Sequence, residues 1–258
     1  MRYAKYLIFT LLLVLLVGNI AFSDDPISLV DVEDIVPNPL RVGEKLTYSI
    51  SWKKLPAGKR TDSILKKEVV NGKDVYYIQS EMKTRALFRP YKFRNQQEMY
   101  FDPMTLSPVR FENHVQDRNY RATVKINFRE GEAGYEKISR LKPKSPQKRE
   151  AKVIEIPVGT QDELSTIYFL RSKQLTLGEI YFFPVLAKGK VHKATLTVER
   201  MEFVKNKILG RVKTLVLRSS RGGRFWITDD ARRLPVKLEF DSKMGALKAT
   251  LTEIEPEN

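Results

Sequence analysis

The stretch Thr160–Leu175, TQDELSTIYFLRSKQL, is the one long amphipathic helix that this sequence predicts, in a chain that otherwise alternates between strands and turns. Thr160 and Glu163 have the spacing of a capping box, in which each side chain satisfies a backbone N–H at the start of a helix. At about 100° per residue, one side of this helix is apolar. The residues that form this apolar stripe are Leu164, Ile167, Tyr168 and Leu175.

Arg171 projects into the middle of the apolar stripe. A buried charge needs a partner, so we expect Arg171 to be buried and paired with a carboxylate or with backbone carbonyls. Two alternatives are an arginine that holds an anionic ligand, and a side chain whose stem packs while its head stays in water. If Arg171 faces an open apolar cavity, it becomes the candidate that holds an anionic head group.

The N-terminal segment Met1–Ser23 has the pattern of a secretory signal peptide. Two basic residues precede the apolar run Leu7–Val17, which is short for a membrane span. Cleavage after Ser23 gives an exported, periplasmic protein that begins at Asp24. The alternative is an uncleaved N-terminal membrane anchor formed by Tyr3–Phe22.

Composition limits the chemistry and the partners of the chain. The sequence has no cysteine, which excludes disulfides, thiolate metal sites and cysteine nucleophiles. Loss of the two basic residues of the signal peptide takes the formal net charge from +15 to +13. Such a field favours an anionic surface as a partner, although charges that alternate with apolar residues are also typical of a solvated sheet face. Export disfavours nucleic acid.

The remainder of the chain predicts antiparallel strands. Leu46–Trp52 alternates between apolar and polar residues, Asn71-Gly72 is a strong hairpin signal, and Pro56-Ala57-Gly58 predicts another turn. About 12 such strands predict a mainly β fold, a large curved antiparallel sheet or partial barrel with one main helix packed on it. The alternative is two stacked sheets, formed by residues 40–141 and 153–255.

The sequence divides into a signal peptide at 1–23, a flexible lead-in at 24–39 and a single β-rich domain at 40–255. Residues 142–152, KPKSPQKREAK, read as a long basic loop or linker and offer the one internal boundary.

No group of residues predicts catalysis, a metal site or a cofactor. His114 and His192 fall on different strands, without the converging ligands that a metal needs. Asp229-Asp230 is typical of a turn, because adjacent residues at a strand end point apart. We therefore expect a protein that is not an enzyme. A hydrolase that uses Asp, Glu and Arg remains as an alternative.

An ordered set of short motifs resembles a known family. The motifs are Val42-Gly43-Glu44-Lys45-Leu46-Thr47-Tyr48, Trp52, Ala57-Gly58, Asp102-Pro103, Leu106, Pro108, Asp162-Glu163-Leu164-Ser165-Thr166-Ile167-Tyr168, Leu170-Arg171, Trp226-Ile227-Thr228-Asp229-Asp230 and Arg233-Leu234-Pro235-Val236. Over about residues 40–255, the sequence resembles the bacterial exported family named domain of unknown function 3108. The resemblance implies a cell-envelope setting and a mostly antiparallel fold, and it brings no catalytic residues. A looser likeness, of architecture alone, is to periplasmic lipoprotein carriers.

These features favour a non-enzymatic cell-envelope protein that binds a hydrophobic or amphipathic ligand, such as a lipid or a lipidated partner. The candidate ligand-binding residues are Arg171, Tyr168, Trp52 and Trp226, since aromatic side chains that do not fill a core line an apolar cavity instead. The alternative is a structural or scaffolding module that binds an envelope protein or an anionic glycan through the loop 142–152 and an exposed sheet edge.

Overall fold

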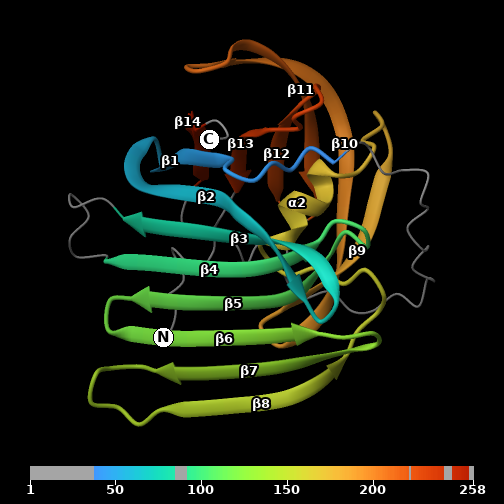
Figure 1. Cartoon of the computed structure of the whole chain (residues 1–258). Helices are drawn as coiled ribbons and strands as arrows, with labels where there is room; N and C mark the ends of the chain where they lie inside the picture. The colour runs from blue at the N-terminus through green and yellow to red at the C-terminus, as the bar shows by residue number, and fades with distance from the viewer. Residues whose placement is uncertain (1–37, 85–91, 221, 241–245, 256–258) are drawn as a thin grey trace.

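A computed structural model of the chain describes residues 38–84, 92–220, 222–240 and 246–255 (Figure 1). The expected signal peptide 1–23, and all but the end of the lead-in 24–39, lie outside these residues. Among the described residues, no helix combines the length and the apolar character needed to cross a membrane.

Fourteen strands and one short helix, α2 (Ser165–Arg171), make up the described structure. The strands are β1 (Lys45–Trp52), β2 (Leu55–Val70), β3 (Lys73–Thr84), β4 (Phe93–Asp102), β5 (Ser107–Asp117), β6 (Tyr120–Phe128), β7 (Glu132–Arg140), β8 (Lys148–Glu155), β9 (Ile180–Ala187), β10 (Lys190–Asn206), β11 (Gly210–Ser219), β12 (Gly223–Thr228), β13 (Pro235–Phe240) and β14 (Leu247–Glu255).

All the strands belong to one antiparallel sheet, so the predicted fold class is confirmed. Their order is β8-β7-β6-β5-β4-β3-β2-β1-β14-β13-β12-β11-β10-β9, which places the first and last strands side by side at the centre. The alternative of two stacked sheets is wrong, because β1 pairs with β14 from Lys45↔Glu255 to Trp52↔Leu247 and joins the two halves.

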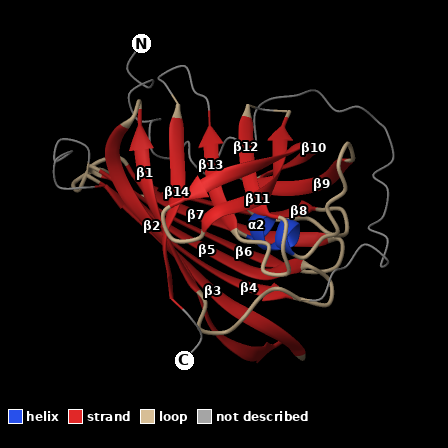
Figure 2. Cartoon of the chain, turned by 90° about the horizontal axis from the view of Figure 1, so that it is seen from above, coloured by secondary structure: helices blue, strands red, loops and turns tan. Residues whose placement is uncertain are grey.

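The sheet curves around α2, which lies inside it (Figure 2). Every second residue of each strand faces the inside of the curved sheet, because successive side chains of a strand point to opposite sides. The helix is buried on nearly all sides: Ser165, Thr166 and the run Tyr168–Arg171 are buried, and only Ile167 is partly exposed. We expected one apolar stripe, but a sheet that wraps around the helix covers its other faces as well.

The helix is much shorter than the expected Thr160–Leu175, and the capping box is wrong. The Asp162 Oδ1 accepts the backbone N–H groups of Leu164 and Ser165, at 2.6 and 2.8 Å, so the helix starts after this cap. The Thr160 hydroxyl donates instead to the carbonyl of Pro157, at 2.6 Å. Gln161 forms a bridge to β9, which holds the chain extended just before the helix.

Two turns show what the sequence does and does not predict. The hairpin at Asn71-Gly72 is confirmed, with φ angles of 52° and 75° that suit the tight turn between β2 and β3. The turn expected at Pro56-Ala57-Gly58 is instead at Lys53-Lys54, where φ is 48° and 70°. Nothing in the residue type predicts this position, since lysine carries no preference for positive φ.

The prediction of a loop or linker at 142–152 is wrong for the second half of this segment. Lys148–Glu155 forms β8, which pairs with β7 from Ser139↔Lys148 to Glu132↔Glu155 and ends the sheet at one edge. Seven of its eight residues are exposed, so its charged side chains are solvated on both faces of the sheet. A charged edge strand of this kind opposes pairing with the edge of another chain.

Candidate functional site

Arg171 is buried and paired with a carboxylate and a backbone carbonyl, as expected, although its Nε has no hydrogen-bond partner among the described residues. Its guanidinium donates to both oxygens of the Glu44 carboxylate, from Nη1 at 2.6 Å and from Nη2 at 2.8 Å, and Nη2 also donates to the carbonyl of Arg232 at 3.2 Å. The side chain of Arg171 is 1% exposed. Burial disfavours the charge, but the hydrogen bonds and the negative charge of Glu44 raise the pKa of Arg171 above its ordinary value.

The four candidate ligand-binding residues do not surround one cavity. Tyr168 is buried beside Arg171, with the guanidinium 5.9 Å from its ring centre. Trp226 is buried next to Lys237, whose Nζ lies 4.0 Å from the indole centre, and its Nε1 donates to Glu202. Trp52 is partly buried at the end of β1. Only Arg171 and Tyr168 lie together, and Glu44 already occupies that guanidinium.

A second buried ion pair, Arg60–Asp62 on β2, was not predicted from the sequence. The Arg60 Nε donates to both Asp62 oxygens, at 2.8 and 3.1 Å, and both side chains are at most 10% exposed. Burial opposes the charge of Arg60, but Asp62 raises its pKa above the ordinary value. The sequence does carry a signal for this pair. Arg60 and Asp62 are in alternation with the buried Ile64, so all three side chains point to the inner face of β2.

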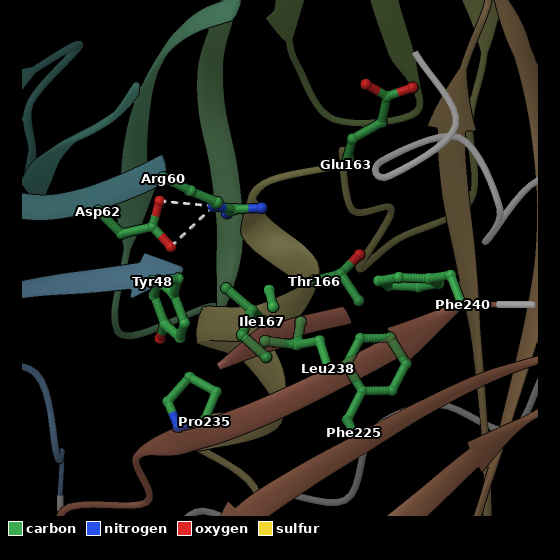
Figure 3. A pocket seen from close by; sticks show the side chains of 11 residues that line it. Tyr48, Arg60, Asp62, Glu163, Thr166, Ile167, Phe225, Pro235, Leu238 and Phe240 are labelled. Atoms are coloured by element: carbon green, nitrogen blue, oxygen red, sulfur yellow. Dashed lines mark hydrogen bonds and ion pairs between the residues drawn. The ribbon is translucent and has the colours of Figure 1, made fainter. Parts of the chain in front are cut away.

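The Arg60–Asp62 pair lines a small cavity beside α2 (Figure 3). Tyr48, Thr166 and Phe225 form other parts of its wall. The cavity volume is about 40 Å³, room for no more than a few water molecules. Burial, and next the charge of Asp62, raise the pKa of Tyr48, whose hydroxyl has no hydrogen-bond partner among the described residues. This cavity is too small for an organic ligand.

A larger cavity, which we call the inner cavity, lies between the inner faces of β3–β7 and Glu163, in the segment just before α2. Its volume is about 220 Å³. Most of its wall is apolar, and the end of β9 closes one side. The lining residues are Met82, Phe93, Asn95, Phe111, Asn113, Val115, Tyr120, Ala122, Val124, Ile126, Tyr135, Lys137, Glu163, Leu186, Ala187 and Lys188.

Two buried side-chain amides face this inner cavity, and the oxygen of each has no hydrogen-bond partner among the described residues. Asn95 is 6% exposed and Asn113 is 8% exposed. Gln97, which pairs in register with Asn113, has an unpartnered Nε2 as well. A buried polar group left without a partner costs about 1–3 kcal/mol. The inner face therefore offers hydrogen-bonding capacity that the protein itself does not use.

One carboxyl, Glu163, and two amino groups, Lys137 and Lys188, line the same inner cavity. Burial, and next the charge of Asp162, raise the pKa of Glu163 to about 8. Burial lowers the pKa of Lys188, which the Glu163 carboxyl counters and Lys137 reinforces. In Figure 3, Glu163 extends away from the Arg60–Asp62 pair. The inner cavity thus combines apolar walls with two cationic groups and one carboxyl that holds its proton near neutral pH.

The other acidic residues considered for chemistry lie elsewhere. Asp230 lies in the expected turn after β12, where its Oδ1 accepts from the backbone N–H of Arg232 at 3.0 Å. Asp229 pairs with Lys213 at 2.8 Å. Neither lines the inner cavity with Glu163. Within the described ranges, no group of three or more His, Asp or Glu side chains is placed to hold a metal ion.

Comparison with known proteins identifies a family and a fold. Residues 47–252 match a family described as Protein of unknown function (DUF3108). The fold is similar to that of a crystal structure titled as a beta-barrel-like protein of domain of unknown function DUF1849 from Brucella abortus. The TM-score is 0.54 and the identity 13%, over 84% of this chain and 98% of that one. At this identity the likeness concerns the fold alone. No curated protein matches the sequence.

Proposed function

The chain belongs to the DUF3108 family, and we propose that it is a non-enzymatic binding protein for an amphipathic ligand, held in the inner cavity. The observation that carries this proposal is an apolar cavity of about 220 Å³ whose wall contains two unsatisfied amide oxygens. A cavity of this size exceeds by an order of magnitude the roughly 10–15 Å³ that one water molecule needs.

The walls match the parts of an amphipathic molecule. Phe93, Phe111 and Ile126 present apolar surface, on which each methylene group of a ligand that leaves water gains about 0.8 kcal/mol. The Oδ1 atoms of Asn95 and Asn113 accept hydrogen bonds, which suits the hydroxyl or amide N–H groups at the junction between an acyl chain and its head.

The proposal includes export to the cell envelope, and it replaces Arg171 as the candidate ligand residue. The signal-peptide pattern of Met1–Ser23 supports export. Because Glu44 occupies both terminal nitrogens of Arg171, the cationic groups that line the cavity, Lys137 and Lys188, are better placed to meet an anionic head.

Native mass spectrometry of the protein purified from its own envelope tests the proposal. The expected result is a mature chain that begins at Asp24 and carries an extra mass, which solvent extraction releases as a lipid or another amphiphile. A bare protein mass from the envelope preparation would contradict it.

A matched pair of variants locates the ligand. V124W places an indole in the inner cavity, whereas K125W places it on the outer face of the same strand, where Lys125 is 42% exposed. With dansyl undecanoic acid as the fluorescent probe, V124W should bind at least about tenfold more weakly and K125W should bind like the wild type. Equal binding by V124W and wild type, with both folded by circular dichroism, would refute the inner cavity as the site.

A further inference from the structure

A row of cationic side chains crosses the outer face of β4–β7, the side opposite the inner cavity. Arg94 pairs in register with Gln116, Gln116 with Arg121, and Arg121 with Arg140. Three arginines and one glutamine therefore stand side by side on four neighbouring strands. We call this set the arginine row.

The arginine row lies in a groove of about 350 Å³. Gln96, His114 and Thr123 form a second, parallel row one step along the same strands and line the groove as well. Among the described residues that line it, none is an aspartate or a glutamate. No carboxylate therefore lines the groove, and two carboxylates next to it contact the second row, Glu98 at 3.1 Å from Gln96 and Glu112 at 3.1 Å from His114.

Backbone carbonyls hold Arg121 and Arg140 in place, and neither forms an ion pair with a carboxylate among the described residues, whereas Arg94 pairs with Glu81. The Arg121 Nη1 donates to the carbonyl of Tyr120, and the Arg140 Nη1 to the carbonyl of Pro143, each at 2.9 Å. Backbone carbonyls orient a guanidinium but carry no net charge. The Nε of Arg140 is buried and has no hydrogen-bond partner among the described residues. The Arg94 Nη2 donates a long hydrogen bond to the Glu81 Oε1, at 3.5 Å.

The register makes this arrangement unfavourable for the free protein. Like charges directly opposite each other on neighbouring strands destabilise a sheet. Arg121 and Arg140 are such a pair, because they are direct partners in the register of β6 and β7 and so point to the same face. An anion between them would convert the repulsion into two attractive contacts.

We infer that the arginine row is a binding site for a phosphoryl group, separate from the inner cavity. The guanidinium fork matches the oxygen spacing of a phosphate and binds it through paired charged hydrogen bonds. A phosphate carries enough charge to meet more than one arginine, and the glutamine and threonine of the groove supply neutral donors to the remaining oxygens. The phosphoryl group belongs either to a lipid head or to a phosphorylated sugar.

The first experiment measures the thermal unfolding midpoint of the mature protein in sodium phosphate and in sodium chloride of equal ionic strength. R121Q/R140Q removes two charges from the row. R110Q/R129Q is the control, because it removes two exposed arginines whose partners are carboxylates outside the groove. Phosphate should raise the midpoint of the wild type and the control by a few degrees more than chloride does, and this difference should disappear in R121Q/R140Q.

Without phosphate, R121Q/R140Q should unfold about 1–3 °C above the wild type, because the repulsion within the row is removed. A salt difference of equal size in all three proteins would overturn the inference, since it would report only the general effect of phosphate on protein surfaces.

The second experiment distinguishes the two sources of the phosphoryl group. Glucose 1-phosphate is titrated by calorimetry, and vesicles of phosphatidylcholine with or without phosphatidic acid are tested by co-sedimentation. Binding of either phosphate carrier that weakens about tenfold or more in R121Q/R140Q, and not in R110Q/R129Q, supports the site and names its source. Binding of neither, or equal loss in both variants, overturns it. Dansyl undecanoic acid should bind R121Q/R140Q normally, which separates this site from the inner cavity.

Discussion

Replacing Arg171 by methionine should destabilise the protein severely. The arginine donates two hydrogen bonds to Glu44 and one to the carbonyl of Arg232, and all three disappear in R171M. Methionine keeps much of the side-chain length and apolar contact, so the change tests the charge rather than the packing.

The magnitude follows from what is left behind. Glu44, whose side chain is 13% exposed, would lose its cation while remaining largely out of water. Removing one partner of a buried ion pair costs about 3–5 kcal/mol. Because Glu44 keeps a little contact with water, we expect a loss of about 3 kcal/mol, which lowers the unfolding midpoint by roughly 6–12 °C in a domain of this size.

Urea unfolding followed by tryptophan fluorescence measures this loss. The control is R149M, which removes an exposed arginine paired with Glu136 and should cost less than about 1 kcal/mol, because its side chain is 71% exposed. The double variant E44M/R171M removes both charges and should recover to within about 1 kcal/mol of the wild type, since apolar residues of similar size replace a buried pair at little cost.

Two results would refute the reasoning. A loss below about 1 kcal/mol in R171M would mean that Glu44 finds water easily and that the pair is not truly buried. A double variant as unstable as R171M would mean that the contact with the Arg232 carbonyl, rather than the charge of Glu44, dominates.

Three further predictions concern other parts of the fold. In urea unfolding, D62N should cost about 2–4 kcal/mol, because it leaves the 10% exposed Arg60 without its carboxylate; a loss under about 0.5 kcal/mol would contradict this burial. The pKa of Glu163 rises from 4.5 to about 8 on folding, so the folded state binds the proton more tightly and stability should fall as pH rises across that window. E163Q should remove most of this fall and leave the smaller part due to Asp162, whose pKa is raised to about 7; an unchanged slope between pH 6 and 9 would count against it. G72A should cost about 1 kcal/mol by thermal unfolding, since φ at Gly72 is 75°, and no measurable loss would argue against this turn.

The strands were predictable because their information is local. Alternation in Leu46–Trp52 and the turn at Asn71-Gly72 depend on neighbours in sequence, and the structure confirms both. The helix was misjudged because its start depends on contacts with distant residues. Gln161 bridges to Val185 on β9, which removes the first turn that the capping box would have required.

The candidate site was predictable only in part. An arginine in an apolar stripe must find a partner, so the class of partner for Arg171 followed from the sequence, but its identity as Glu44, 127 residues away, did not. The inner cavity could not be predicted, because whether Phe93 and Phe111 meet other side chains or leave space depends on how strongly the sheet curves. The arginine row needed the register of β6 and β7, which alternation alone does not give.

The pairing of β1 with β14 has a consequence for how the chain folds. The two strands at the centre of the sheet are the first and the last in the sequence, joined from Lys45↔Glu255 onward. Nearly the whole described chain lies between these two strands and must close as a loop before they can pair. Such long-range pairing is typical of slow folding. A chain still emerging from the ribosome lacks β14, so β1 has an unpaired edge until synthesis ends. The hairpins on either side of this pair can form early, but the complete sheet forms only when β14 is present to pair with β1.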